Sequence, residues 1–370
     1  MNILIVGAGF SGAVIAECLT RSSKHQVTVI ESRSHLGGNC HTQRDLETGI
    51  MLHTYGPHIF NTDNLEVWQY ISRFCEMMPY TNRVKTVYEN EVYSFPINLH
   101  TINQFFKKNL NPESAREFLK KLADATIDMP ENFEQQALKF VGPELYHAFL
   151  YGYTKKQWGC EPSELPASIL KRLPVRFNYN DNYYSTKYQG IPKNGYTPIF
   201  EQMFDRENIK VLLNTKFNAG EIDADFDHIF YTGPIDELFH YRFGRLGYRT
   251  VFFNRFDVAG DHQGNAVINY ADVDVPYTRV HEHKHFTPWE SHDRSVYFEE
   301  FSKETTEMDV PYYPKRLSHD MDLLKLYQIE ASKVKRYTML GRLATYRYMD
   351  MHHVIGEALR AAEEFELNHT

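Results

Sequence analysis

The chain begins with a short apolar run, NILIV, that leads directly into the glycine-rich sequence GAGFSG. A continuous apolar run of this length is typical of a strand buried in a parallel sheet. After such a strand, Gly7 permits a tight turn, Gly9 lets the backbone approach a pyrophosphate, and Gly12 lets the following helix pack on the strand. We therefore predict a helix over residues 11–22, whose first N–H groups would bind the phosphates of a dinucleotide.

A second strand is predicted over QVTVIE, residues 26–31, and it ends at a carboxylate. Glu31 follows the third glycine by roughly 20 residues, the spacing at which an acidic residue hydrogen-bonds a ribose 2′-hydroxyl. A carboxylate at this position disfavours a 2′-phosphate. The sequence thus predicts a dinucleotide with an unphosphorylated ribose.

Arg33 and the doublet Gly37-Gly38 distinguish a flavin from a nicotinamide dinucleotide. A second glycine pair shortly after the ribose acid lets the chain turn back along the diphosphate, as is typical of FAD proteins. The sequence HIFYTGP, which ends at Pro234, has the apolar character of another strand of this sheet. No second glycine motif with its own ribose acid follows, so no NAD(P)H domain is expected. The sequence indicates a flavoprotein that is not built as a reductase.

Charge, length and cysteine pattern narrow the class of protein. The formal net charge of −8 argues against a general binder of nucleic acid or anionic membranes. A length of 370 residues indicates two or three domains. The four cysteines lack CxxC spacing, which favours reduced thiols. No apolar run reaches the roughly 20 residues of a membrane span, and no secretory signal is recognised, so we expect a soluble cytoplasmic protein.

The rest of the chain divides into helical and β-rich stretches. A helical pattern covers residues 111–157, and prolines punctuate the next segment, about 160–177, which we predict to be structured but mobile. Residues 248–301 are rich in β-branched and aromatic residues with turn signals, which predicts antiparallel sheet. The chain ends in an amphipathic helical pattern, MHHVIGEALRAAEEFEL.

The expected fold class is α/β, with a Rossmann-like FAD-binding domain, a helical insertion and an antiparallel β-sheet domain. The FAD-binding domain would be discontinuous and comprise residues 1–78, 190–240 and 318–370. The helical domain would comprise residues 100–178, with its mobile lid at about 160–177. The sheet domain would comprise residues 79–99, 179–189 and 241–317.

Two arginines are candidates for binding an anionic substrate. Arg172 lies in ILKRLPVRF and Arg279 in VPYTRVHEH. Arginine suits a diphosphate because its planar fork forms bidentate, charge-assisted hydrogen bonds. The alternative is that each arginine pairs with a surface carboxylate. Tyrosine hydroxyls could also contact phosphate oxygens, and the candidates are Tyr183, Tyr184 and Tyr313.

Aromatic residues are abundant, with 25 tyrosines and 25 phenylalanines. Most are expected to be buried in the core, with tyrosine hydroxyl groups at its solvent-exposed edges. Tyrosine-rich clusters in Gly- and Pro-bearing segments, such as NYNDNYYSTKYQG, look more like the walls of a binding cleft. Phe149 and Tyr153 stand at i, i+4 on one face of the predicted helix, a spacing usual for core packing that would also suit a base-stacking wall.

The sequence HEHKH raises the question of a metal site. His281, His283 and His285 alternate and could face one way from a strand, as metal ligands do. Glu282 and Lys284 would then fill the opposite face, as in a solvated strand. Because no other acidic or cysteine cluster accompanies them, no metal is expected.

Asp350 stands just before the last predicted helix, where it is a good N-cap. In a flavoprotein, a helix N-terminus near the isoalloxazine N1 and O2 would stabilise negative charge there. Such a helix N-terminus would stabilise the anionic reduced form of the flavin.

Motifs along essentially the whole chain resemble the bacterial type of the UDP-galactopyranose mutase family. In order they are GAGFSGAV, GGN, YGPHIFNT, GYTKKQWG, ELPASILKRLPVRF, YQGIP, YTGPID, QGNAVINY, VPYTR, EHKHF, PYYP and GRLATYRYMDMH. The resemblance implies an FAD enzyme that interconverts UDP-galactopyranose and UDP-galactofuranose without net redox change. Reduced FAD would act through N5 as a nucleophile on the anomeric carbon, which is a form of covalent catalysis.

The resemblance also implies roles by position. Arg172 on the lid and Arg279 on the body would clamp the diphosphate and stabilise the charge of the leaving UDP. The other substrate-binding residues would be Asn82, Phe149, Tyr153, Trp158, Tyr183, Tyr313, Tyr348 and Asn61. The cofactor-binding residues would be Gly7, Gly9, Gly12, Glu31, Arg33, Gly38, Asn39, His58, Arg342, Asp350 and Met351. The implied partners are a UDP-sugar, an external reductant and a second copy of the chain, and the product would feed a cell-surface polysaccharide.

Two positions depart from the family pattern. This chain reads GPHIFNT where the family usually reads GAHIFHT, so Pro57 and Asn61 replace alanine and histidine. The missing histidine would lie near flavin and sugar. Its loss could alter the rate or mark another sugar, such as an N-acetylated, 6-deoxy or pentose analogue.

Three other functions fit part of the sequence. A flavin oxidoreductase of the amine-oxidase superfamily would share the FAD domain and the helix-end motif, but it would prefer an apolar tunnel to paired arginines. A non-catalytic nucleotide-sugar binder is disfavoured by the retained RYMD and both arginines. An NAD-dependent sugar epimerase is disfavoured by Gly37-Gly38 and by the absence of a YxxxK motif in a suitable helix.

Overall fold

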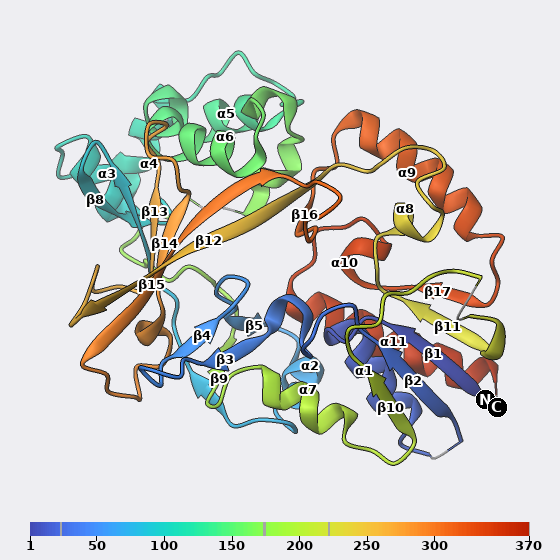
Figure 1. Cartoon of the computed structure of the whole chain (residues 1–370). Coiled ribbons are helices and arrows are strands. Elements are labelled where there is room, and N and C mark those ends of the chain that lie inside the picture. The colour runs from blue at the N-terminus through green and yellow to red at the C-terminus, as the bar shows by residue number, and fades with distance from the viewer. Residues whose placement is uncertain (23, 173–174, 221–222, 370) are drawn as a thin grey trace. The chain divides into compact units, whose positions relative to one another are not determined.

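The computed structural model describes residues 1–370 except 23, 173–174, 221–222 and 370, and it leaves the side chains of residues 168, 171–172 and 223 undescribed. The chain forms two compact units (Figure 1). The first comprises residues 1–80, 186–247 and 318–370, and the second comprises residues 81–185 and 248–317. The helical segment and the antiparallel sheet, for which we predict separate domains, lie together in the second unit.

The first unit is built on a five-stranded parallel sheet with the order β10–β2–β1–β11–β17. The strands are β1 (Asn2–Val6), β2 (Gln26–Ile30), β10 (Ile209–Leu212), β11 (His228–Tyr231) and β17 (Tyr337–Met339). The strands predicted at the start of the chain and at HIFY are confirmed. They lie side by side, with Ile5 opposite Phe230.

Both faces of this sheet are covered, which explains why its central strands are largely apolar. Because side chains alternate along a strand, Ile3 and Ile5 pack on one side against α1, α7 and α11, while Leu4 packs on the other side with residues of α8 and α10. Full burial of each such side chain contributes about 1.5–3 kcal/mol. The helices are α1 (Phe10–Leu19), α7 (Thr197–Phe204), α8 (Ile235–Leu238), α10 (Gly341–Ala344) and α11 (Met351–Asn368).

The predicted first and last helices are both present, with small differences in their ends. The first ends at Leu19 rather than at residue 22. Thr20 follows it, and its hydroxyl donates to the carbonyl oxygen of Ala16, so the side chain competes with the backbone at this end. The last helix extends to Asn368 and buries Ile355, Ala358 and Phe365 on its apolar face, as its amphipathic pattern predicts.

Smaller elements complete the first unit. They include a hairpin of β3 (Thr42–Arg44) and β4 (Met51–His53) and a three-stranded sheet of β5 (Phe60–Thr62), β9 (Tyr188–Pro192) and β6 (Met77–Pro79). Two further helices are α2 (Leu65–Ile71) and α9 (Ser318–Ala331).

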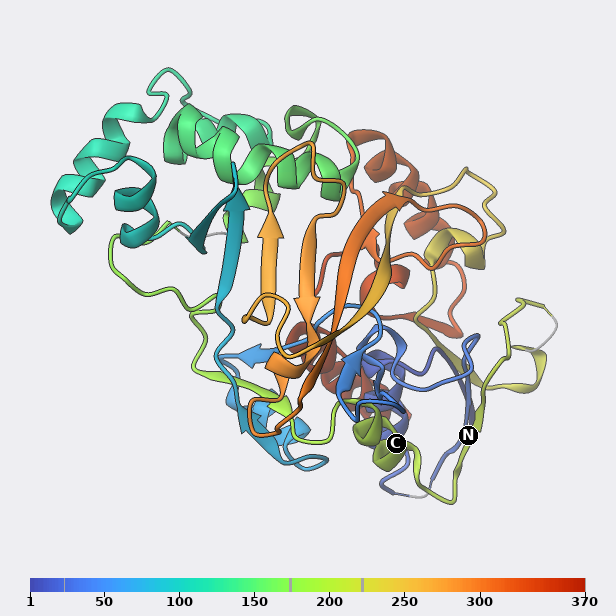
Figure 2. The ribbon, with the colours of Figure 1, turned by 60° about the vertical axis from the view of Figure 1, so that its left-hand side comes forward.

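The second unit contains a seven-stranded sheet with the order β16–β12–β15–β14–β13–β7–β8. The strands are β7 (Val84–Tyr88), β8 (Glu91–Phe95), β12 (Tyr248–Ala259), β13 (Val267–Tyr270), β14 (Arg279–Glu282), β15 (Arg294–Glu304) and β16 (Tyr313–Pro314). All neighbours pair antiparallel except β13 and β7. The prediction of antiparallel sheet between residues 248 and 301 is confirmed, and Figure 2 shows its longest strands, β12 and β15, side by side.

Asparagine residues start three helices of this unit. Asn98 caps α3 (Leu99–Phe105), Asn111 caps α4 (Pro112–Leu122), and Asn132 caps α5 (Phe133–Tyr146). In each case the side-chain oxygen accepts a backbone N–H of the first turn, an interaction that contributes about 1 kcal/mol. The helical pattern predicted for residues 111–157 is therefore confirmed, and local capping explains where its parts begin.

The helical segment continues through a π-helical turn, His147–Tyr151, into α6 (Gly152–Trp158). Phe149 lies in this π-helical turn and Tyr153 in the first turn of α6, and their common face stays a prediction. After α6, two short 3-10 helices, Pro162–Glu164 and Ala167–Arg172, occupy the segment predicted as a lid. Its mobility stays a prediction.

Candidate functional site

The glycine turn after β1 has the geometry that the motif requires. Gly7 has φ +104°, and a β-carbon there would overlap the Thr232 hydroxyl. A β-carbon on Gly12 would overlap the backbone oxygen of Gly7. Only glycine fits at these two positions, because the start of α1 is pressed against the turn that precedes it.

Glu31 is buried at the carboxyl end of β2 and is held by the backbone on both sides. Its Oε2 accepts the N–H of Ala8 in the glycine turn, and its Oε1 accepts the N–H of Arg33, each at 2.9 Å. The predicted ribose acid thus lies directly beside the turn that would hold the pyrophosphate.

The second glycine pair returns the chain to the first turn. Gly37 and Gly38 both have positive φ, and the N–H of Gly37 donates to the carbonyl oxygen of Ala8 at 3.0 Å. A β-carbon on Gly38 would lie 3.4 Å from the α-carbon of Gly9. The backbones of Gly9 and Gly38 thus lie next to each other, with no side chain between the two glycine turns.

Arg33 reaches over this region with its guanidinium stacked on Tyr55, 4.4 Å from the ring centre. One terminal nitrogen donates to Asn39 Oδ1 at 2.7 Å. The other, NH1, is buried and has no hydrogen-bond partner among the described residues. A buried donor without a partner costs free energy, so this nitrogen is suited to an anionic ligand.

A second arginine comes from the C-terminal part of the chain. Gly341 has φ +77°, and a β-carbon there would lie 2.5 Å from the Ser11 hydroxyl at the start of α1. Arg342 follows it, and its guanidinium lies 5.1 Å from the ring centre of Tyr348. Burial raises the pKa of the Cys40 thiol to about 12, although the charges of Arg342 and Arg33 act in the opposite direction. The guanidinium groups of both arginines therefore lie close enough to the Cys40 thiol, beside the second glycine pair, to lower its pKa.

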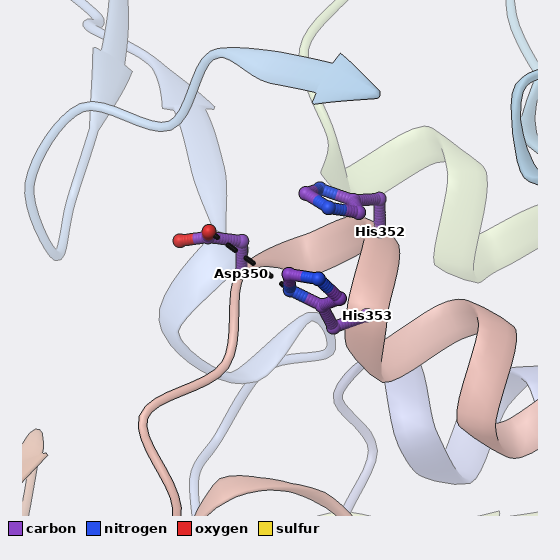
Figure 3. Close-up of side chains that lie close together, drawn as sticks. All are labelled: Asp350, His352 and His353. Carbon is purple, nitrogen blue, oxygen red and sulfur yellow. Dashed lines mark ion pairs between the residues drawn. The ribbon is translucent and has the colours of Figure 1, made fainter. Parts of the chain in front are cut away.

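The start of α11 presents Asp350, His352 and His353 (Figure 3), and Met351 is the first residue of the helix. Asp350 occupies the N-cap position, and its carbonyl oxygen accepts the N–H groups of His353 and Val354. Its side chain makes no cap hydrogen bond, which corrects that part of our prediction. Instead, Oδ2 lies 3.9 Å from His353 Nδ1. The carboxylate still lies at the positive end of an 18-residue helix.

Asn61 lies close to this helix end. It stands on β5, and its side chain donates to the carbonyl oxygen of Ile59 at 3.3 Å. A hydrogen bond joins the His352 ring to the Asn61 backbone, while burial, followed by the charge of His353, lowers the pKa of His352. His58, in the same motif, lies with its Nδ1 2.8 Å from the carbonyl oxygen of Gly56.

In the second unit, Arg279 begins β14 and pairs with a carboxylate of the neighbouring strand. Its Nε donates to Glu300 Oε1 at 2.9 Å. The Thr278 hydroxyl donates to the same oxygen at 3.3 Å. Glu300 is 2% exposed, whereas the Arg279 side chain is 22% exposed. The partner is therefore a buried carboxylate, unlike the surface carboxylate of our alternative interpretation.

Three of the predicted tyrosines gather around this arginine. Burial raises the pKa of the Tyr153 hydroxyl. The positive charge of Arg279 partly offsets this increase, while Tyr183 and Tyr313 add to it. The pKa of the Arg279 guanidinium lies well above its ordinary value, because Glu300 and these three tyrosines outweigh its burial. The structure thus brings one arginine, its carboxylate and three phenol groups together from α6, β14, β15, β16 and the segment before β9.

Asn82 and Trp158 belong to the same unit. The carbonyl oxygen of Asn82 accepts the N–H of Tyr183 at 2.8 Å. Its side-chain Oδ1 is buried and has no partner within the described part of the chain, so it is suited to a ligand donor. Trp158 is the last residue of α6, which ends at Gly159 in the left-handed conformation.

Phe149 has mainly core contacts. It is 2% exposed and packs against the rings of Tyr93 and Phe105 at centroid distances of 5.0 and 5.3 Å. These contacts match the core-packing alternative. A base-stacking role would need a face of the ring to be reached by the ligand.

A cavity of about 440 Å³ lies elsewhere in this unit. Its lining contains none of the predicted substrate residues, and consists of Lys85, Val92, Tyr93, Ser94, Asn98, His100, Gln104, Tyr179 and Asp181.

Arg172 ends the 3-10 helix Ala167–Arg172. Its side chain lies outside the described residues. The structure therefore describes the Arg279 half of the predicted clamp, and the Arg172 half stays a prediction.

The prediction for HEHKH is wrong in its geometry. β14 ends at Glu282, and residues His283–Phe286 form a 3-10 helix, so the three histidines do not share a strand face. Glu282 is fully buried rather than solvated. It accepts the backbone N–H groups of residues 262, 263 and 264 and the Ser295 hydroxyl. The loop at 260–264 turns its donors inward, which the alternation of the sequence does not reveal.

Two groups of three donors approach within 4.8 Å of one another in the described residues. They are Asp350, His352 and His353, and Asp261, Glu282 and His285. In the second group the Glu282 oxygens are already occupied by four donors. In the first, the Asp350 and His353 side chains are both more than a third exposed. Neither group has the closed set of ligands that a structural metal requires.

Sequence reasoning missed Glu300, which holds Arg279. A signal was available in YFEEF, where period-2 alternation puts Glu300 on the same face as Val296 and Phe298, both of which are buried. A buried acid between apolar neighbours indicates a paired cation.

The parallel sheet, the glycine turn after β1 and the acid at the end of β2 define a Rossmann-like dinucleotide-binding protein. A family model described as an NAD(P)-binding Rossmann-like domain matches residues 5–74. A second family model, described as UDP-galactopyranose mutase, matches residues 148–348. The chain belongs to the UDP-galactopyranose mutase family and is therefore an enzyme of the isomerase class.

Similar proteins support this family over the full length. The chain is 54% identical to a probable UDP-galactopyranose mutase of Klebsiella pneumoniae, over 98% of this chain and 94% of that protein. It is 48% identical to a dTDP-fucopyranose mutase of Escherichia coli, over 99% of both. It is 31% identical to a UDP-galactopyranose mutase of Mycoplasma pneumoniae, over 98% of this chain and 96% of that one.

Solved structures share the fold. A crystal structure of reduced UDP-galactopyranose mutase has a TM-score of 0.76 at 16% identity, covering 98% of this chain and 93% of that one. A putrescine oxidase has a TM-score of 0.60 at 13% identity, covering 98% of both. Within the described residues, no helix is long and apolar enough to cross a membrane.

Proposed function

We propose that this protein interconverts the pyranose and furanose forms of UDP-galactose, with no net redox change and with FAD as its cofactor in the reduced state. The observation that carries the proposal is the group of Arg279, Glu300 and three tyrosines within the region that matches the mutase family. This group presents a fixed cation and hydroxyl donors, which is the chemistry that a nucleoside diphosphate requires.

The residues of the first unit fit FAD. At Gly9 and Gly38 the absence of a side chain leaves room that a β-carbon would reduce. Glu31 is placed to bind a ribose hydroxyl. Arg33 has a buried N–H donor without a partner among the described residues. Bound there in its reduced form, FAD would supply N5 as the nucleophile for the anomeric carbon. The N-terminus of α11 with Asp350 would lie toward the flavin, as the family resemblance implies.

The protein's own residues would act on the leaving group. When the bond between the anomeric carbon and the diphosphate breaks, negative charge grows on the UDP oxygen. Arg279 would stabilise this charge without reorganisation, since Glu300 already holds its guanidinium. Tyr153, Tyr183 and Tyr313 would donate hydroxyl hydrogen bonds, and Arg172 would close the clamp from the other side.

The sugar is the finer part of the proposal. UDP-galactose is favoured by the 54% identical relative, while the 48% identical relative acts, by its name, on dTDP-fucopyranose. Asn61, near the start of α11, is the candidate for adapting the site to a 6-deoxy or other sugar. An amine-oxidase type of reaction is the second candidate function, and it rests on fold alone.

We further propose that the enzyme works in the cytoplasm as a homodimer, takes electrons from an external reductant and supplies galactofuranose for a cell-surface polysaccharide. These statements rest on the family resemblance.

Turnover of UDP-galactofuranose by the purified protein, with and without dithionite, tests the proposal. We expect conversion to the pyranose only when the flavin is reduced, and about a hundredfold loss in Arg172→Ala. The same assay with dTDP-fucofuranose distinguishes the sugars. Full turnover by Arg172→Ala would remove the clamp from the mechanism, and turnover with oxidised flavin would contradict the nucleophilic role.

A further inference from the structure

Two adjacent lysines in α6 have opposite surroundings. Lys155 has a side chain that is 39% exposed, and it forms an ion pair with Glu161 at 2.6 Å. Lys156 forms no ion pair with the residues that the structure describes. Its Nζ lies within hydrogen-bond distance of four backbone carbonyl oxygens, those of Tyr270 (2.9 Å), Asp272 (2.7 Å), Val275 (2.8 Å) and Tyr277 (3.0 Å).

One of the four carbonyl groups belongs to Tyr270, the last residue of β13, and the other three belong to the connection from β13 to β14. We call residues 270–278 the 270–278 loop. An ammonium has three N–H donors, so the four oxygens share them and surround the charge. Carbonyl dipoles that converge on one point repel one another unless a cation lies between them. The side chain of Lys156 therefore supplies the centre around which this loop is organised. Burial lowers the pKa of Lys156 to about 8, which agrees with a position withdrawn from water.

A second contact presses the loop against the same helix. Gly152, one turn before Lys156, lies so close to the loop that a β-carbon on it would overlap the carbonyl oxygen of Ala271. The loop is also held by β7, because the N–H of Ala271 donates to the carbonyl oxygen of Val87. Helix and loop thus form one packed unit with a polar centre.

The contact between α6 and the 270–278 loop connects two parts of the proposed diphosphate site, Tyr153 and Arg279. The same helix carries Tyr153, and the loop ends at Thr278, next to Arg279. Thr278 is itself fixed to β15, because its N–H donates to the carbonyl oxygen of Glu300 at 2.8 Å. A change in the loop would therefore be passed to the Arg279–Glu300 pair.

We propose that Lys156 is a positioning residue, whose ammonium organises the 270–278 loop and thereby sets Arg279 relative to Tyr153 for binding the diphosphate of the substrate. The effect of Lys156 on substrate binding rests on the proposed function. The organisation of the 270–278 loop around the Lys156 ammonium does not depend on that function.

The first test compares Lys156→Met with Lys155→Met, which removes the neighbouring charge from the surface. In Lys156→Met we expect the Kd for UDP and the KM for the UDP-sugar to rise about tenfold, with a smaller fall in kcat, at unchanged FAD content. In Lys155→Met we expect changes of less than about twofold. Equal and small effects in both variants would overturn the proposal.

The second test does not depend on activity. Hydrogen–deuterium exchange of the peptides covering residues 270–279 should become faster in Lys156→Met and stay unchanged in Lys155→Met. If the wild type turns over no nucleotide sugar, the proposed function fails, while this measurement still decides the role of Lys156. Unchanged exchange would refute it.

Chemical rescue gives a readout that a merely structural role would not produce. In Lys156→Ala the carbonyl groups remain but the cation is missing, so added ethylammonium should restore at least part of the UDP affinity relative to sodium at equal ionic strength. Lys155→Ala should show no such difference. If Lys156→Met and Lys156→Ala do not fold, Lys156→Arg keeps the charge with a different donor geometry and should show an intermediate UDP affinity. Wild-type affinity in Lys156→Arg, or no rescue in a folded Lys156→Ala, would contradict the proposal.

Discussion

Arg279 and Glu300 stand opposite each other on neighbouring strands and are joined by a hydrogen bond of 2.9 Å from Nε to Oε1. The bond uses Nε, so it does not consume the two terminal nitrogens that form the fork preferred by phosphates. The buried carboxylate holds the direction of the guanidinium and keeps it charged. Binding of a diphosphate would then require little reordering of the side chain, which lowers the entropic cost of binding.

Removing this carboxylate should weaken nucleotide binding. In Glu300→Ala we expect the Kd for UDP to rise at least about tenfold, because a hydrogen bond between charged groups contributes about 1.5–3 kcal/mol and each 1.4 kcal/mol is a factor of ten. Titration with UDP, followed by the flavin absorbance, measures the effect. Glu299→Ala, one position away on the opposite face of β15, is the control and should bind UDP normally. Wild-type affinity in Glu300→Ala would show that Glu300 does not orient Arg279 for the ligand.

Two glycines of the first motif should respond differently to alanine. A β-carbon on Gly9 meets no protein atom closer than 3.9 Å, so Gly9→Ala should fold normally but lose FAD, since the added methyl group occupies the approach of the pyrophosphate. A β-carbon on Gly12 overlaps the backbone of Gly7, so Gly12→Ala should destabilise the fold whether or not FAD is bound. Thermal unfolding of the apoproteins and the FAD content of the purified proteins separate the two effects. A stable Gly9→Ala protein with full FAD content would contradict the proposed position of the diphosphate.

Acid should destabilise the first unit through His228. This histidine is buried in β11, its Nε2 lies 2.8 Å from Thr338 Oγ1, and burial lowers its pKa to about 4. The unfolded chain binds a proton at about pH 6.5 and the folded chain does not, so stability is present above this pH and is lost as the pH falls. Between pH 7 and pH 5 the free energy of unfolding should decrease by about 2 kcal/mol from this group.

The variant His228→Gln tests that assignment, because glutamine can still hydrogen-bond Thr338 but does not titrate. Its free energy of unfolding, measured by denaturant at both pH values, should depend on pH less steeply than that of the wild type. Parallel pH dependences would assign the acid sensitivity to other groups.

Glu282 should prove to be a structural residue rather than a metal ligand. It accepts four hydrogen bonds in a fully buried position, so Glu282→Gln should lower the free energy of unfolding by about 3 kcal/mol by leaving buried donors without partners. Asp261→Asn, at the exposed end of the same group, should have little effect. Treatment of the wild type with a chelator should leave the unfolding midpoint unchanged, and a decrease would support a metal at this group instead.

Local sequence determined most of the first unit. The apolar run, the glycine spacing and Glu31 predicted β1, α1, β2 and their dinucleotide geometry, because a tight turn between buried elements depends on short-range sterics. Helix starts in the second unit are equally local, as the asparagine caps show. The motifs along the chain were specific enough to indicate the family before the fold was known.

Tertiary structure alone decided which charged groups meet. Glu300 and Arg279 are distant in sequence and become partners only through the register of β14 and β15. Likewise, nothing local separates Lys155 from Lys156, yet one lies at the surface and the other at the centre of four carbonyl groups. Glu282 was predicted on a solvated face because its alternation is that of an exposed strand, but a remote loop brings its N–H donors to it. Pairing of buried charges depends on contacts between segments that are far apart along the chain, and periodicity within one segment carries no information about them.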